Sequence, residues 1–196
     1  MESSQDDFEI EQKDIVDIVK GKERRTESLA EEPGWSRFDG DLACRVVKQF
    51  LKKHLPDDLK VVGPNAYIDG YPVEFDLLLV THSAIPAAFT NAYRDNEVHF
   101  VIEVESRGDM DRTFLNELFQ EFETLRNSYK HVKCTYLTIN QALSNQRTSS
   151  MSHVEEFKKV LEPEYRVFCL AQSGTHKIIS GQWREFVNHL VPDRKL

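Results

Sequence analysis

The sequence predicts a mixed α/β domain in which helices flank one central sheet. Segments 71–81 and 99–106 each combine a stretch of alternating apolar and polar residues with a continuously apolar run, which is typical of strands at the boundary of a core. Apolar residues recur at three- and four-residue spacing over 42–51 and 114–125, which is the spacing of amphipathic helices. The two patterns follow one another in the order α-β-β-β-α-β and then α-β-α, so strands and helices are interleaved around one sheet.

Composition excludes several classes of protein. The chain has 196 residues, 40% hydrophobic and 30% charged, which suits one well-packed globular domain. No stretch approaches the ~18 consecutive apolar residues of a membrane span, and the acidic N-terminus lacks the apolar region of a secretory signal. Cys44, Cys134 and Cys169 are odd in number and widely separated, as expected of reduced thiols in an intracellular protein of the cytoplasm or nucleus. No HExxH motif and no glycine-rich phosphate loop is present.

The first 33 residues differ from the remainder. They hold 11 acidic and 5 basic residues, so most of the net charge of −8 lies there. We expect residues 1–33 to be an acidic, flexible tail and residues 34–196 to form the folded domain. The alternative is a helix, with Ile10, Ile15 and Ile18 on one side, that docks on a protein partner or on the chain's own domain.

The first half of the domain is predicted as one helix followed by strands. A helix is expected within 38–55, with Asp39 or Asp41 as its N-cap. Short strands at 59–63 and 65–69 precede the turn signal Asp69-Gly70, and one long strand is expected over 71–81.

The second half alternates strands with helices. A loop is expected at 83–97. It is followed by a strand at 99–106, a helix at 112–129, a strand at 132–139, a polar loop at 143–153, a short helix at 154–161, a strand at 165–172 and a helix at 182–191.

Four carboxylates stand out on the two strongest strands. Glu74 and Asp76 share one face of the first, and Glu103 and Glu105 share one face of the second, because side chains alternate with period two. If the two strands pair, as consecutive strands often do, the four groups fall in a patch less than about 10 Å across. The patch is either a merely solvated polar face or a site where an ion balances the charges.

A bound cation would compensate the repulsion in such a patch. Neither strand contains Lys or Arg, and Arg107 is the nearest basic residue. Carboxylates this close, beside apolar residues, repel one another and are costly to bury. Mg²⁺ prefers carboxylate oxygens together with water and phosphate oxygens, so a divalent cation is expected here.

The segments GYPVEFDLLLV and HFVIEVESRG resemble the two-part motif of the PD-(D/E)XK nuclease superfamily. The order of elements over residues 39–140 resembles its restriction endonuclease-like αβββαβ core. The resemblance implies that Asp76 and Glu103 bind Mg²⁺ or Mn²⁺, together with the carbonyl of Val104, and that Glu74 is a further ligand.

The chain departs from the family pattern at Glu105, which stands where most members carry a catalytic lysine. The motif is therefore E-x-E, as in some restriction endonucleases of the superfamily. Glu105 would act as the base or bind a second metal ion; alternatively, Arg107 supplies the positive charge. Acidic residues of the first helix complete such sites in the family, so the resemblance makes Asp41 or Asp39 a candidate member of the site as well as a candidate N-cap.

The resemblance implies a metal-dependent endonuclease that hydrolyses phosphodiester bonds, most simply of DNA, of the restriction, defence or repair type. The alternative is an inactive nuclease-like module that binds nucleic acid or a protein partner. Double-strand cleavage by so small a domain suggests a homodimer. Candidate nucleic-acid contacts are Arg107, Arg112, Lys133 and Arg147, and Gln120 on the helix after the motif faces the site in this reading.

Overall fold

The computed structural model describes residues 5–27, 35–88, 90–109, 112–142, 165–172 and 177–192. The expected loop at 143–153 and short helix at 154–161 lie outside this part of the chain. No helix within these ranges is long and apolar enough to cross a membrane.

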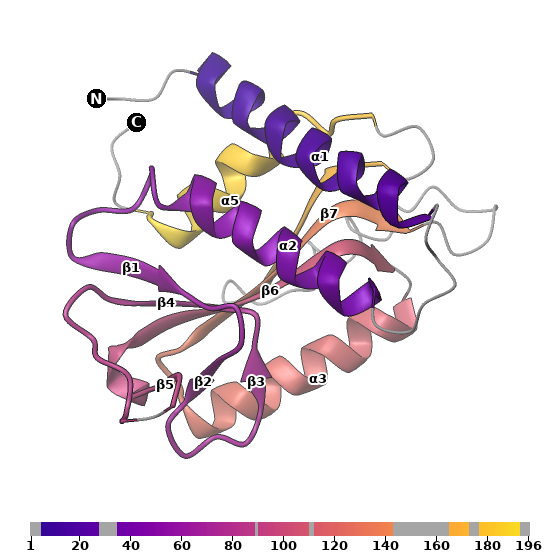
Figure 1. Cartoon of the computed structure of the whole chain (residues 1–196). Coiled ribbons are helices and arrows are strands. Elements are labelled where there is room, and N and C mark those ends of the chain that lie inside the picture. Colours follow the sequence, from indigo (N-terminus) through magenta and orange to yellow (C-terminus); the bar gives the residue numbers. More distant parts are fainter. Residues whose placement is uncertain are drawn as a thin grey trace.

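A mixed five-stranded sheet organises the described chain (Figure 1). Its order is β1-β4-β6-β7-β8, with antiparallel pairing from β1 through β4 to β6 and parallel pairing from β6 through β7 to β8. The strands are β1 (Leu59–Val62), β4 (Leu77–Thr81), β6 (Val98–Asp109), β7 (Lys133–Ala142) and β8 (Tyr165–Ala171). The expected mixed α/β architecture is confirmed.

A second, three-stranded sheet was not expected. It has the order β3-β2-β5 and consists of β2 (Ala66–Ile68), β3 (Glu74–Phe75) and β5 (Ala92–Tyr93). The prediction of one strand over 71–81 is therefore wrong. The chain bends at Asp76, so that β3 pairs with β2 while β4 pairs with β1 and β6. The expected loop at 83–97 holds β5 and a short 3₁₀ helix, Asp95–Glu97.

The helices cover both faces of the central sheet and give the molecule two cores. The helices are α1 (Gln5–Glu27), α2 (Trp35–Leu51), α3 (Arg112–Ser128) and α5 (Gln182–Leu190). Side chains of α1, α2 and α5 pack in one core with the sheet face that carries Phe100, Ile102 and Val104. Side chains of α3 and of the second sheet pack in the other core, with Val101 on the opposite face.

The helix α2 begins at Trp35, earlier than expected. Asp39 and Asp41 therefore lie within the helix, and the expectation that one of them is the N-cap is wrong. Asp41 is left available for the site that α2 approaches.

The expectation of a flexible tail over residues 1–33 is wrong for α1. Phe8, Ile15, Val16 and Val19 are almost completely buried in the core beneath α1, α2 and α5. The alternative of a helix that docks on its own domain is what the structure has. Ile10 and Ile18 lie on the outer side of the helix, 58% and 43% exposed.

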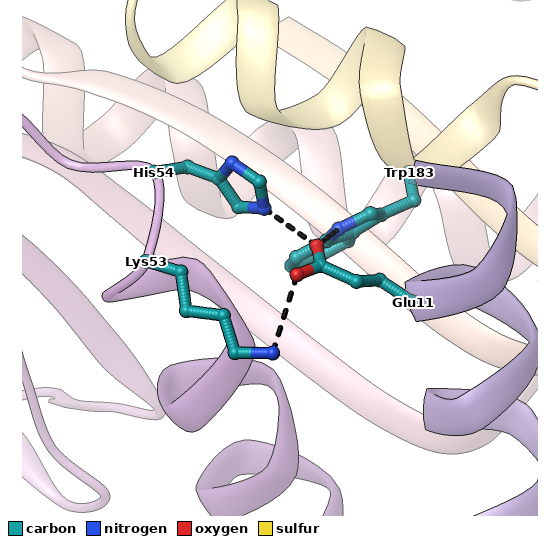
Figure 2. Close-up of polar contacts among 4 residues, drawn as sticks. All are labelled: Glu11, Lys53, His54 and Trp183. Carbon is teal, nitrogen blue, oxygen red and sulfur yellow. Dashed lines mark hydrogen bonds and ion pairs between the residues drawn. The ribbon is translucent and has the colours of Figure 1, made fainter. Parts of the chain in front are cut away.

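Polar side chains of α1 tie it to α5 and to the end of α2. Glu11 accepts hydrogen bonds from His54 Nε2 at 2.5 Å, from Trp183 Nε1 at 3.0 Å and from Lys53 Nζ at 3.2 Å (Figure 2). These donors lower the pKa of Glu11, although burial opposes them. The carboxylate therefore stays charged where three elements meet.

The same helix completes the N-terminus of α5, where the first backbone N–H groups have no partner within the helix. The side chain of Glu9 accepts a hydrogen bond from the backbone N–H of Gly181 at 2.8 Å, and the side-chain oxygen Oε1 of Gln12 accepts one from the backbone N–H of Trp183 at 3.0 Å. The Gln12 amide donates to the carbonyls of Leu170 at 2.9 Å and Ile179 at 2.7 Å. These hydrogen bonds therefore attach α1 to β8 and to the start of α5.

Candidate active site

Pairing of β4 with β6 brings the predicted carboxylates together. Leu77 lies opposite Ile102, so the next pair along the antiparallel ladder is Asp76 with Glu103. Along β6, Val101, Glu103 and Glu105 alternate with residues of the α1–α2–α5 core and so share one side of the strand. The expected strand pairing is confirmed.

Asp76 is held on three sides. Its Oδ2 accepts a hydrogen bond from the backbone N–H of Val104 at 2.8 Å. The buried thiol of Cys44, on α2, and the carboxyl group of Glu103 are also hydrogen-bonded to its carboxylate. The bend at Asp76 turns this side chain across β6, away from the path of a continuous strand.

The turn at Gly63 sets the backbone position of Asp76. Gly63 has a φ of +113°, and a Cβ atom there would lie 2.2 Å from the Asp76 carbonyl oxygen. Only glycine permits both this conformation and this approach. Lys48 of α2 donates a hydrogen bond to the Gly63 carbonyl and fastens the turn to the helix that carries Cys44.

Burial and mutual repulsion raise the pKa values of the three central carboxyl groups. Burial, followed by repulsion from Asp76 and a hydrogen bond to it, raises the pKa of Glu103 well above its usual range. Burial also raises the pKa of Asp76, with a contribution from the charge of Asp41, although the hydrogen bonds from Val104, Cys44 and Glu103 oppose it. Burial and the neighbouring charges thus favour the protonated form of Glu103 more strongly than that of Asp76.

Glu105 belongs to the same electrostatic cluster, whereas Glu74 is displaced from it. Burial and the charge of Asp76 raise the pKa of Glu105. Glu74 lies on β3 in the second sheet, is exposed, and accepts a hydrogen bond from the hydroxyl of Tyr67. The bend at Asp76 therefore removes Glu74 from the same-face position beside Asp76 that was expected for it.

Of the candidate nucleic-acid residues, Lys133 does not lie at the carboxylates. Lys133 lies at the start of β7, its ammonium 5.5 Å from the ring centre of Phe100, on the α5 side of the sheet. Glu103 and Glu105 lie on the opposite side. For Arg107 and Arg112 only the backbone is described, and Arg147 lies outside the described residues.

Three residues of the site were not predicted from the sequence. Cys44 and Glu121 approach Asp76 and Glu103 from the two flanking helices, and Gly63 supports Asp76. Glu121 had a recognisable signal, since the residues at 117, 120, 121 and 124 form a polar stripe at helical spacing. Cys44 had none, because a buried cysteine is usually a packing residue.

The residues present fit a divalent cation. No group of three or more His, Cys, Asp or Glu side chains is arranged as a ligand set within the described ranges. Mg²⁺ does not require one, because it is usually held by one or two carboxylates and completes its shell with waters and substrate phosphates. Burial and the charge of Asp76 raise the pKa of Glu103, and a cation at this place would relieve the same repulsion.

Comparison with known proteins supports the fold. No protein-family model and no curated protein matches the chain. Among solved structures, the cAAA-bound form of E. coli MS115-1 NucC is 13% identical, with a TM-score of 0.61, over 97% of this chain and 91% of that one. The cAAA-bound form of P. aeruginosa ATCC27853 NucC is 10% identical, with a TM-score of 0.59, over 97% and 92%. This similarity confirms the expected restriction endonuclease-like α/β fold.

Proposed function

We propose that this chain is a metal-dependent nuclease that hydrolyses phosphodiester bonds of DNA. The observation that carries the proposal is the Asp76–Glu103 pair, two carboxyl groups that come together where β4 begins beside β6 and whose pKa values burial raises. A bound cation would relieve the repulsion between these carboxylates, and a cation held in this way in a nuclease-like fold suits phosphodiester hydrolysis. The E-x-E motif and the resemblance to the PD-(D/E)XK superfamily support the same assignment.

Asp76 and Glu103 would hold Mg²⁺ or Mn²⁺, with the carbonyl of Val104 as a third ligand. The N–H of Val104 points to Asp76, and in an extended strand the C=O of a residue points to the same neighbour as its N–H. The cation supplies, when bound, charge stabilisation on the scissile phosphate and a lowered pKa of its water. Cys44 and Gly63 keep Asp76 in place.

Glu105 would be the base. In the hydrolysis, the oxygen of a water molecule adds to phosphorus, the bond from phosphorus to one ester oxygen breaks, and that oxygen takes a proton from solvent. The proton of the attacking water goes to Glu105. Its raised pKa brings its titration nearer to neutral pH, which suits a general base better than an ordinary carboxylate.

Cleavage assays on plasmid and on single-stranded DNA test the proposal. With Mg²⁺ or Mn²⁺ the wild type should cleave, and Asp76→Asn and Glu103→Gln should each lose activity and calorimetric metal binding. Glu123→Gln, on the exposed surface of α3, is the control for removal of one carboxylate and should retain both.

The replacement of lysine by Glu105 favours a second candidate, an inactive nuclease-like module that binds nucleic acid or a protein partner. In that case no metal and no substrate gives cleavage, and Asp76→Asn binds nucleic acid as the wild type does. Carboxylate-dependent Mn²⁺ binding without cleavage on any DNA or RNA would also contradict the nuclease.

A further inference from the structure

A pocket of about 570 Å³ opens beside Glu103, between the segment 71–75 and the helix α3. This volume is within the range of sites that hold small molecules, roughly 300–1,000 Å³. Glu103 lines it, so the pocket is continuous with the carboxylate cluster. Whatever occupies the pocket therefore lies next to the proposed reaction centre.

One wall of the pocket is flat and aromatic. The ring of Tyr71 stacks on Phe75 with centroids 5.8 Å apart and an angle of 14°, and meets Tyr129 edge-on at 5.9 Å. Phe122 of α3 also lines the pocket, and Val73 stands 45% exposed beside it. Phe75 and Phe122 are almost completely buried, so the partly exposed ring of Tyr71, held in place by Phe75 and Tyr129, is the one able to stack with a planar ring such as a nucleobase.

The other wall accepts hydrogen bonds. Glu117, Gln120 and Glu121 lie at helical spacing on α3 and line the pocket. Glu74 lines it from β3, in the segment 71–75. No lysine or arginine is among the described residues that line it. The carboxylates repel a phosphate from the pocket but accept hydrogen bonds from N–H groups.

A nucleotide carries both a phosphate, which a cation binds, and a planar base, which an aromatic wall and hydrogen-bond acceptors bind. Its phosphate suits the cation held by Asp76 and Glu103, and its planar base suits the adjoining pocket. We propose that the pocket receives the base next to the scissile phosphate, and that it favours bases with an exocyclic amino group (adenine, cytosine, guanine) over thymine. The proposal rests on the proposed nuclease function.

The same geometry selects the class of substrate. A base reaches the pocket only when it is unstacked, and in a duplex this costs a few kcal/mol. Single-stranded, frayed or damaged DNA is therefore the preferred substrate. The three α3 side chains are distinct from the groups that hold the cation, so base preference and metal binding can be changed separately.

Cleavage of single-stranded oligonucleotides of uniform sequence tests the preference. The wild type should cleave oligo-dA and oligo-dC about tenfold faster than oligo-dT, the discrimination expected from one well-placed polar contact to a base edge. Glu117→Gln and Glu121→Gln should reduce this ratio, whereas Glu123→Gln, on the same helix but outside the pocket, should retain it. Equal rates on all sequences in the wild type would overturn the proposal.

A binding experiment separates failure of this proposal from failure of the nuclease assignment. Deoxyadenosine, deoxycytidine and thymidine are titrated into ¹⁵N-labelled Asp76→Asn, which leaves the pocket intact. The amide signals of Val73, Gln120 and Thr124 should shift with the first two nucleosides and less with thymidine, whether or not the wild type cleaves DNA. No shift with any nucleoside, or shifts with spermidine alone, would overturn the proposal, the latter in favour of a cationic ligand.

Discussion

Replacement of Gly63 by alanine tests whether the turn beneath Asp76 sets the geometry of the site. Gly63 contributes no side chain to the carboxylate cluster and is separated from Asp76 by 13 residues in the sequence. It lies so close to the Asp76 carbonyl oxygen and to Leu77 that an added Cβ would collide with them. A loss of metal affinity in Gly63→Ala would therefore arise from displacement of Asp76.

The expected magnitude has two parts. A non-glycine residue at a φ of +113° costs about 1–3 kcal/mol in backbone strain. The added Cβ would also lie 2.2 Å from the Asp76 oxygen, whereas real Cβ contacts essentially never fall below 3.0 Å, so one group must move by about 0.8 Å. Metal–ligand distances tolerate only about 0.2 Å, and changes to supporting residues typically weaken metal binding 10- to 100-fold.

Calorimetric titration with Mn²⁺, together with urea unfolding, measures both parts. Gly181→Ala is the matched control, because Gly181 also has a positive φ, +79°, but nothing closer than 3.8 Å to an added Cβ. Both variants should lose stability through strain. Only Gly63→Ala should lose Mn²⁺ affinity, by about 10- to 100-fold.

The reasoning is refuted if folded Gly63→Ala binds Mn²⁺ as tightly as the wild type. The turn would then yield without moving Asp76. Equal loss of Mn²⁺ affinity in Gly181→Ala would refute it too, because strain far from the site would be sufficient.

Three further changes probe the other features of the site and core. Without metal, the raised pKa of Glu103 means that the folded state binds a proton on this carboxyl group more tightly than the unfolded chain does. This stabilisation is complete below the usual pKa of 4.5 and is lost as the pH rises through the raised pKa. The urea midpoint should therefore fall with rising pH in the wild type and fall less in Glu103→Gln. Gln12→Ala leaves the buried N–H of Trp183 without its acceptor and removes one of the two hydrogen bonds to each of the Leu170 and Ile179 carbonyls, so it should lower the free energy of unfolding by about 2 kcal/mol in urea titrations, while Lys13→Ala, on the exposed side of α1, should not change it measurably. Cys44→Ala removes a hydrogen bond to Asp76 and should weaken Mn²⁺ binding about tenfold by calorimetry, whereas Cys44→Ser should restore most of it, and equal affinities of the two variants would rule out the hydrogen bond as the cause.

The sequence was sufficient to predict which strands meet at the site. The continuous apolar residues of β4 and β6 require burial on both faces, and the acids that interrupt them must lie where the core ends. The pairing of Asp76 with Glu103 follows from that pattern and from the tendency of consecutive strands to pair. Local information is enough because the two strands lie close together in the chain.

The bend at Asp76 and the docking of α1 depend on partners that the local pattern does not reveal. The alternation over 73–77 runs directly into the apolar residues 77–80, but it does not say that Glu74 pairs with Tyr67 in another sheet. Likewise, the charged sequence of α1 looks like a solvated tail until Glu9 and Gln12 meet α5, about 170 residues away. Polar groups that satisfy distant backbone atoms leave no periodic signal in their own segment.

The closure of α5 by α1 has a consequence for how the chain folds. The hydrogen bonds of Gln12 span 158 to 171 residues, so α1 can reach its final place only after the chain has been synthesised as far as Trp183. Contacts of such high sequence separation carry a large loop-closure entropy and slow the folding of a domain. Until Trp183 has been synthesised, the apolar side of α1 lacks the α5 residues of the core that it shares in the folded protein.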